Sequence, residues 1–300
     1  MLESSPQSLA NNISDVALVF EGGGMRAAYT CAVVQELIHQ ELWFPFVAGI
    51  SAGSSNSLNY VLRDGPRAEQ SFVDIAEHPE FGSWRTWVRG RGMFNSEFIY
   101  GGTGGPGQPL PLDWSTFEAN PITLNVGGFN ARTGEHVYWT KDDMPDLASM
   151  AVRIRASSTM PGLMPMPVID GEPWCDGALG SNGGIALDAA KAAGYDKFFV
   201  VLTRAAGYRK APARLPRAYD VVFRRYPMVA RALLERAENY NRVLDELAEL
   251  ERQGRAYVFR PTHMKIANGE KRIDRLREAH ALGAAQAGAE VPAWREFLGL

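Results

Sequence analysis

The chain of 300 residues is 46% hydrophobic and 22% charged, which predicts a folded protein with one large core or two small ones. Its formal net charge of -3 gives no electrostatic reason to expect nucleic acid as a partner. Two cysteines, Cys31 and Cys175, are too few for a disulfide framework and favour a reducing compartment.

Residues 1–14 are polar and predict a flexible tail that lacks the basic start and apolar stretch of a signal peptide. No apolar run reaches the roughly 18 residues that a membrane-spanning helix needs. We therefore expect a cytoplasmic protein whose contact with a membrane is peripheral, from one side only.

Strands and helices alternate at the start of the folded chain. The apolar run at 15–20 predicts a buried strand, and apolar residues at near-helical spacing predict a helix over 27–40. A second strand is expected over 43–49 and a second helix over 52–62. Because this alternation is typical of parallel sheets, the sequence predicts an α/β fold with a largely parallel sheet.

The segment 81–112 is irregular, rich in Gly and Pro, and interspersed with Trp, Phe and Arg. Long irregular segments in compact domains are usually functional loops or disordered. Its aromatic and basic residues suit a lipid headgroup boundary, and they suit equally a loop whose rings pack on the core. We predict a substrate-cover loop here, with Trp84 and Trp87 as the candidates for membrane contact.

The rest of the chain again predicts regular elements. Strands are expected over 122–131, 134–140, 197–204 and 255–261, and helices over 147–160, 226–254 and 270–288. Acidic residues on the polar face of the helix over 226–254 favour a packing helix over a membrane anchor. Because no linker divides the chain, residues 15–300 are expected to form a single domain.

A glycine-rich motif, "EGGGMR", joins the first strand to the first helix and contains Gly22, Gly23, Gly24, Met25 and Arg26. Glycines here let the backbone approach a ligand, and amides at a helix start point at negative charge. A dinucleotide, a phosphate or the oxyanion of acyl transfer would fit, as would a plain tight turn. The acidic residue of a dinucleotide site and the Gly-Lys-Ser/Thr of a phosphate loop are both absent.

The second motif, "GISAG", places Ser51 between Gly49 and Gly53 at the predicted passage from strand to helix. A nucleophile elbow has this context, because the serine is held in a strained turn that only small neighbours allow. The third motif is Asp176-Gly177-Ala178. It predicts either a common turn aspartate or a general base near Ser51.

Together the three motifs resemble those of the patatin-like phospholipase family. The segments "ASSTMPGLMPMPVIDGEPWCDGA" and "NARTGEHVYW", and the long helix followed by "GRAYVFRP", extend the similarity over roughly residues 14–300. The resemblance implies a three-layer α/β/α fold with a mainly parallel sheet and a Ser–Asp dyad, with Ser51 as nucleophile and Asp176 as base. The amides of residues 22–26 would form the oxyanion hole, and no metal or other cofactor is implied.

The chemistry that the resemblance implies is hydrolysis of carboxylic esters of lipids through an acyl-serine intermediate. A carboxylate of ordinary pKa is a weak base for a serine, so Asp176 should be partly desolvated, with Pro173, Trp174 and Cys175 as the apolar wall. Members of the family often have a proline soon after Asp-Gly, whereas this chain has "SNGG", which predicts a less rigid loop.

Two alternatives stay open at this level. One is a degenerate family member that only binds lipid or a partner. The other is a Ser-His-Asp triad, for which His263, directly after a strand, is the candidate. His39 and His280 are expected to face solvent from helices, and His78 and His136 precede the aspartate, the wrong chain order for an α/β-hydrolase.

Overall fold

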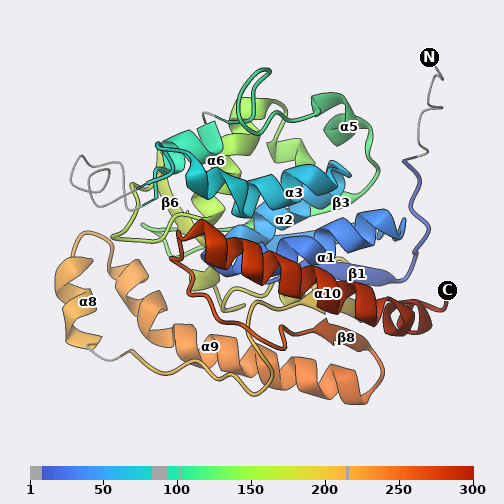
Figure 1. Cartoon of the computed structure of the whole chain (residues 1–300). Coiled ribbons are helices and arrows are strands. Elements are labelled where there is room, and N and C mark those ends of the chain that lie inside the picture. Colours follow the sequence, from blue (N-terminus) through green and yellow to red (C-terminus); the bar gives the residue numbers. More distant parts are fainter. Residues whose placement is uncertain (1–8, 83–93, 102, 214–215) are drawn as a thin grey trace.

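Short apolar segments form the strands of one mainly parallel sheet (Figure 1). The computed structural model describes residues 9–82, 94–101, 103–213 and 216–300. Within these residues the sheet has eight strands, in the order β5-β6-β3-β2-β1-β7-β8 with β4 beside β3. The strands are β1 (Val16–Phe20), β2 (Phe46–Ile50), β3 (Thr123–Asn130), β4 (His136–Trp139), β5 (Val168–Ile169), β6 (Glu172–Asp176), β7 (Lys197–Val201) and β8 (Ala256–Phe259).

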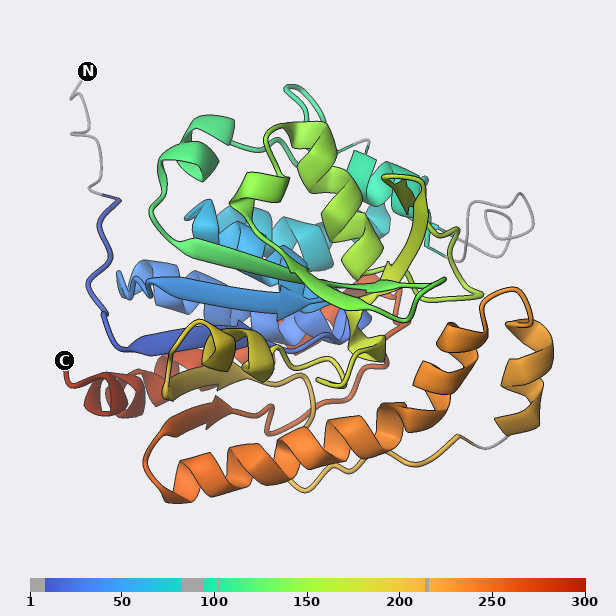
Figure 2. The same cartoon turned by 180° about the vertical axis from the view of Figure 1, so that it is seen from behind.

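Helices cover both faces of this sheet (Figure 2). Their bounds are α1 (Ala27–His39), α2 (Ala52–Val61), α3 (Gly65–Phe72), α5 (Trp114–Ala119), α6 (Leu147–Ser157), α7 (Leu187–Ala192), α8 (Pro216–Val222), α9 (Pro227–Arg252) and α10 (Ile273–Leu298). Single turns of 3₁₀-helix lie at Gly24–Arg26, Asp74–Glu77, Lys141–Asp143 and Gly177–Leu179, and a π-helical turn lies at Glu97–Gly101.

The predicted parallel arrangement is confirmed. The central strand β1 pairs in parallel with β2 and β7, while β3 and β8 extend the sheet in parallel on either side. The hairpin partner β4 and the strand β6 both run antiparallel to β3. The carboxyl ends of β1 and β2 therefore open at one edge of the sheet, where ligands of open α/β sheets bind.

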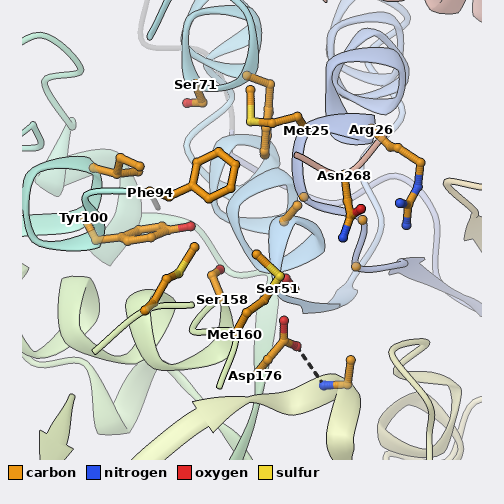
Figure 3. Close-up of a pocket in the computed structure, with 18 of the residues that line it drawn as sticks. Met25, Arg26, Ser51, Ser71, Phe94, Tyr100, Ser158, Met160, Asp176 and Asn268 are labelled. Atoms are coloured by element: carbon orange, nitrogen blue, oxygen red, sulfur yellow. Dashed lines mark hydrogen bonds between the residues drawn. The ribbon is translucent and has the colours of Figure 1, made fainter. Parts of the chain in front are cut away.

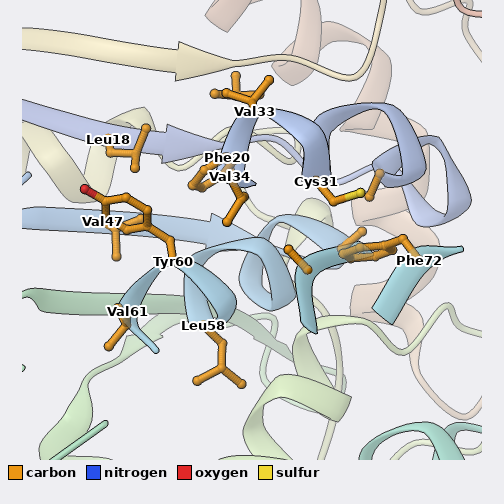
Figure 4. Close-up of a cluster of buried hydrophobic side chains, with 14 of the residues drawn as sticks. Leu18, Phe20, Cys31, Val33, Val34, Val47, Leu58, Tyr60, Val61 and Phe72 are labelled. Carbon is orange, nitrogen blue, oxygen red and sulfur yellow. The ribbon is translucent and has the colours of Figure 1, made fainter. Parts of the chain in front are cut away.

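Alternate side chains of the central strands enter two separate cores. Leu18 and Phe20 belong to one buried cluster with Val33 and Val34 of α1 and Leu58 of α2 (Figure 4). On the other face of the sheet, Ala17 and Val19 belong to a second buried cluster with side chains of α7 and α9. This alternation gives three layers, helices on either side of a sheet, as the α/β/α prediction requires.

Among the boundaries that differ from the sequence predictions, three have a physical reason in the structure. The second strand begins at Phe46, directly after Pro45, which has no amide to donate to a neighbouring strand. The last helix, α10, extends to Leu298 and contains Pro292, whose exposed position lets water bond the carbonyl that loses its amide partner. Asn12, in the predicted tail, exchanges hydrogen bonds with the Trp43 backbone, so ordered structure starts before residue 15.

The glycines of α10 give a matched test of how closely this helix packs on α1. A Cβ at Gly283 would lie 2.2 Å from the Tyr29 carbonyl oxygen, whereas a Cβ at the exposed Gly288 would meet nothing within 4 Å. We expect Gly288→Ala to raise the free energy of unfolding by about 1 kcal/mol, since alanine favours the helix. Gly283→Ala should lower it by about 1–3 kcal/mol through overpacking. Chemical denaturation of both variants checks this, and equal shifts would contradict it.

The predicted cover loop is described only in part. Trp84 and Trp87, with the neighbouring arginines, lie outside the described residues. On either side of that gap, Phe81 and Phe94 are buried against each other with ring centroids 5.6 Å apart. Across the described part of the chain, no helix is long and apolar enough to cross a membrane.

Candidate active site

Ser51 occupies the turn between β2 and α2 in a strained backbone conformation. Its φ of 56° and ψ of -129° lie outside the regions that non-glycine residues ordinarily adopt, at a cost of roughly 1–3 kcal/mol. Its amide donates to the Ser157 Oγ at 3.0 Å, which helps to hold the turn. The side chain stands at the N-terminus of α2, where the helix dipole favours a developing negative charge.

The two glycines that flank Ser51 are required by close backbone contacts. A Cβ at Gly49 would lie 2.2 Å from the Gly53 carbonyl oxygen, and a Cβ at Gly53 would lie 2.3 Å from the Phe20 carbonyl oxygen. Helix α2 thus approaches β1 and β2 closely enough that neither position has room for a side chain. The Gly-x-Ser-x-Gly pattern is therefore a packing requirement of this elbow.

Two amides of the glycine-rich loop are already engaged. The Gly22 amide donates to the Gly184 carbonyl at 3.0 Å. The Met25 amide donates to the Asn268 carbonyl, also at 3.0 Å. These bonds hold the loop in place from two distant parts of the chain, and they occupy two of the five predicted oxyanion donors.

Of the other three amides in this loop, one has a backbone acceptor and two have none among the described residues. The Arg26 amide is directed at the Gly23 carbonyl at 3.3 Å, while its guanidinium donates to the Thr203 Oγ1. Among the described residues, no backbone carbonyl accepts the amides of Gly23 and Gly24. Gly24 has a φ of 54°, and a Cβ there would lie 2.4 Å from the Asn268 carbonyl oxygen, so this position too requires glycine.

Asp176 ends β6 and is only 6% exposed. Its Oδ1 accepts a hydrogen bond from the Ala178 amide at 2.9 Å, the bond drawn in Figure 3. The following Gly177 packs on β3, since a Cβ there would lie 2.5 Å from the Gly127 carbonyl oxygen. The loop "SNGG" is stabilised by Asn182, whose side-chain oxygen accepts a hydrogen bond from the Gly184 amide at 2.8 Å. Hydrogen bonds thus hold this loop without the family's proline.

The environment makes Asp176 a stronger base than an exposed aspartate. Burial raises the pKa of its carboxyl group, against the opposing influence of Arg236. Hydrogen bonding from the Ala178 amide and from the Ser51 hydroxyl lowers the pKa by smaller amounts. The carboxylate points toward Ser51 across the pocket (Figure 3).

Ser51 and Asp176 open into one pocket that encloses about 790 Å³ including its mouth. The glycine-rich loop borders it, and apolar side chains form much of the remaining wall: Met25, Phe72, Phe81, Phe94, Ile99, Met160 and Met164. Figure 3 shows Phe94 and Tyr100 to one side of Ser51, with Arg26 to the other. The pocket therefore has an apolar side and a basic side.

The histidines lie apart from this pair. His263 is exposed, bonds to Thr262 Oγ1 at 3.1 Å, and borders a different pocket with Lys265. His39 faces solvent as predicted, at 76% exposure of its side chain. The same prediction for His280 was wrong. Its side chain is 15% exposed because α10 packs on α1, where its Nε2 bonds the Gln35 Oε1 at 2.6 Å.

Several residues of the pocket carried no signal in the sequence. Arg236 of α9 and Asn268, which precedes α10, both line it. Ser157, at the end of α6 and outside the pocket lining, accepts the Ser51 amide. Within the described residues, no group of three or more His, Cys, Asp or Glu could hold a metal ion.

Comparison with known families assigns the chain. The family model described as patatin-like phospholipase matches residues 18–189, more than half of the chain. The chain belongs to the patatin-like phospholipase family. A second family model, described only as a domain of unknown function (DUF6363), matches residues 226–299.

Individual relatives are distant from this patatin-like protein. The uncharacterised protein YjjU of Escherichia coli (strain K12) is 25% identical over an alignment of 178 residues, and the match covers 55% of this chain and 45% of YjjU. The matched part thus spans about half of that relative. The crystal structure of VipD from Legionella pneumophila covers 100% of this chain and 72% of VipD, with 14% identity and a TM-score of 0.46.

Proposed function

We propose that this protein is a serine acyl hydrolase that cleaves carboxylic ester bonds of lipids with a Ser–Asp dyad. Membership of the patatin-like phospholipase family supports hydrolysis of lipid esters. The observation that carries the dyad is the pairing of Ser51, on a strained elbow, with the buried carboxylate of Asp176 in one pocket.

The reaction would proceed in two half-reactions. The Ser51 Oγ attacks the ester carbonyl carbon while Asp176 takes the hydroxyl proton, and the tetrahedral intermediate collapses as Asp176 returns that proton to the leaving alcohol. Water then attacks the acyl-serine, Asp176 accepts its proton, and the fatty acid leaves as the Ser51 hydroxyl is restored. The raised pKa of Asp176, caused chiefly by burial, supports both proton transfers.

Gly23 and Gly24 are the oxyanion donors that we propose. Their amides are the ones in the loop without a backbone acceptor among the described residues, and they border the pocket beside Ser51. Losing one such donor typically costs about 10²–10³ in rate. The Gly22, Met25 and Arg26 amides would instead keep the loop in the geometry that aims this pair.

The substrate's acyl chain fits the apolar side of the pocket. Phe72, Ile99 and Tyr100 line both the pocket with Ser51 and a second, mainly apolar pocket of about 580 Å³ including its mouth. Apolar lining with a few placed polar groups is typical of sites for small ligands with long apolar parts. This arrangement supports a lipid ester over a small hydrophilic ester.

A fluorophosphonate probe tests the proposed nucleophile directly. We expect the probe to label the wild-type protein on Ser51 and to leave Ser51→Ala unlabelled, because only an activated serine attacks the phosphorus. His263→Ala should be labelled at the wild-type rate, since His263 lies outside the pocket. Mass spectrometry of the labelled peptide identifies the residue.

Two results would overturn this function. No labelling of well-folded wild-type protein would favour a lipid- or partner-binding member of the family. Loss of labelling in His263→Ala, with circular dichroism unchanged, would favour a histidine base. A dinucleotide-binding function has no support at the glycine-rich loop, because β2 ends without an acidic residue.

A further inference from the structure

Four basic side chains gather on one side of the pocket that contains Ser51. We call them the cation cluster: Arg26, Arg204, Lys210 and Arg236. Arg26 and Arg236 line the pocket itself, and the other members lie close enough to act electrostatically on Lys210. The cluster comes from three segments, since Arg204 and Lys210 follow β7 and Arg236 belongs to α9.

The carboxylates facing the cation cluster do not balance its charge. Glu21 acts on Arg26 and Lys210, but its carboxylate already accepts the Tyr240 hydroxyl at 2.8 Å and the Thr203 amide. The other carboxylate is Asp176, which the proposed mechanism uses for proton transfer. The carboxylate of Glu21, which acts on Arg26 and Lys210, is thus already engaged, and Asp176, on which Arg236 and Lys210 act, is the proposed base.

No member of the cation cluster forms a salt bridge with another described residue. The adjacent, exposed Arg209 provides the contrast, because its guanidinium pairs with Asp245 at 2.6 Å. The Nε atoms of Arg204 and Arg236 are buried and have no hydrogen-bond partner among the described residues. Both side chains are half-buried, and partly buried cations without a salt-bridge partner favour an anion supplied from outside.

The cation cluster is held in place by contacts that do not neutralise it. Asn241 of α9 clamps Lys210, accepting its backbone amide at 2.9 Å and donating to its carbonyl at 3.0 Å. The Lys210 Nζ lies 4.5 Å from the centre of the Tyr240 ring, and the Arg204 guanidinium lies 4.3 Å from that of Tyr208. Aromatic faces stabilise a cation without removing its charge. Burial, followed by repulsion from Arg236, lowers the pKa of Lys210 to about 8.

We propose that the cation cluster binds the phosphate of a net-anionic phospholipid headgroup while Ser51 cleaves a carboxylic ester that links an acyl chain to the same lipid. The inference rests on the function proposed above for the same pocket. Guanidinium groups match the geometry of phosphate oxygens, and they stand opposite the apolar wall that suits the acyl chain. A headgroup with a quaternary ammonium would bring a further positive charge to these cations, so anionic headgroups are preferred over zwitterionic ones.

Paired substrates test the headgroup assignment. We compare kcat/KM for phosphatidylglycerol with kcat/KM for diacylglycerol that carries the same acyl chains, both in detergent micelles. In the ratio of the two values, any effect of a substitution on the dyad cancels. We expect this ratio to fall about tenfold to a hundredfold in Arg236→Met and Lys210→Met, as loss of a hydrogen bond to a charged group implies. Arg209→Met is the matched control, and its ratio should stay at the wild-type value.

Inorganic phosphate tests the site without catalysis. Phosphate, compared with sodium chloride at equal ionic strength, should raise the wild-type Tm by about 2–4 °C and leave Arg236→Met and Lys210→Met unchanged. Without phosphate, both variants should melt at or above the wild-type Tm, because each removes a poorly compensated cation. This measurement also establishes that the variants fold.

The outcomes separate the two proposals. Wild-type ratios and wild-type phosphate responses in both variants would overturn the anion site while ester hydrolysis stands. A phosphate response lost in the variants, without hydrolysis of any ester, would support the anion site and overturn the hydrolase. If the response is lost but the ratio is unchanged, the site is supported and its ligand is free phosphate instead of a headgroup.

Discussion

Replacing Asp176 by asparagine is expected to lower kcat/KM for ester hydrolysis by about 10⁴-fold, the upper range for removal of a general base. Asparagine keeps the shape and accepts the Ala178 amide bond, but it takes no proton from Ser51. Steady-state hydrolysis of a p-nitrophenyl ester measures the loss. Asp170→Asn is the matched control, because this exposed aspartate lies in the turn before β6 and should leave the rate unchanged.

Stability should change in the opposite direction to activity. Burial raises the folded-state pKa of Asp176 above its unfolded value, so the folded protein binds this proton more tightly. The stability gained is fully present below the unfolded pKa and is lost as the pH rises through the folded pKa. Near neutral pH, the charged carboxylate is therefore a cost that asparagine removes.

Asp176→Asn should accordingly melt at or above the wild-type temperature at pH 7. Wild-type activity should fall as the pH drops through the raised pKa of Asp176, since the protonated acid cannot act as the base. An inactive variant with a clearly lower Tm would instead assign Asp176 a structural role. Retained activity in Asp176→Asn would remove it from the mechanism.

Replacing Gly49 by alanine is expected to destabilise the fold by about 3 kcal/mol, at the upper end for overpacking. The added Cβ would lie 2.2 Å from the Gly53 carbonyl oxygen and 2.4 Å from its carbonyl carbon. Both are backbone atoms of α2, so relief requires the helix to move away from β2. That movement displaces Ser51, and a shift of about 1 Å at a reacting group costs on the order of 10²-fold in rate.

Two measurements check this expectation for Gly49→Ala. Denaturant unfolding gives the loss of stability, and fluorophosphonate labelling at a temperature where the variant stays folded gives the loss of reactivity. Gly288→Ala, described above, is the control for a glycine without steric contacts. If Gly49→Ala is as stable as the wild type, the turn around Ser51 can accommodate a methyl group and the predicted steric clash is wrong.

The sequence predicted the parts of the fold whose signals are local. Apolar runs such as the one at 197–204 mark buried strands, and the glycines around Ser51 mark a turn between strand and helix. This glycine pattern can be recognised in the sequence because α2 packs closely on β1 and β2. At each of the two positions a side chain would collide with a backbone carbonyl. The end of α10 at Leu298 was harder to predict, because the helix continues through Pro292, a residue that normally ends or kinks a helix.

Only those residues of the candidate site that belong to short sequence motifs could be predicted. The residues alone left Asp176 undecided between a turn and a base, and the resemblance to the family decided that assignment. Arg236 and Asn268 had no local signal, because one is a cation on a long amphipathic helix and the other a residue in an irregular segment. Tertiary packing alone brings them to the pocket.

The sheet order has a consequence for how this family's sequences are divided. The patatin-like model ends at residue 189 and the DUF6363 model begins at 226, yet β7 and β8 continue the same sheet from β1 outward. A fragment ending at 189 would leave β1 as an unpaired edge and release the Met25 amide from Asn268. In this chain, the segment named for its unknown function supplies Arg236 and Asn268 to the pocket, and the boundary between the two families is a break in sequence similarity within one continuous sheet.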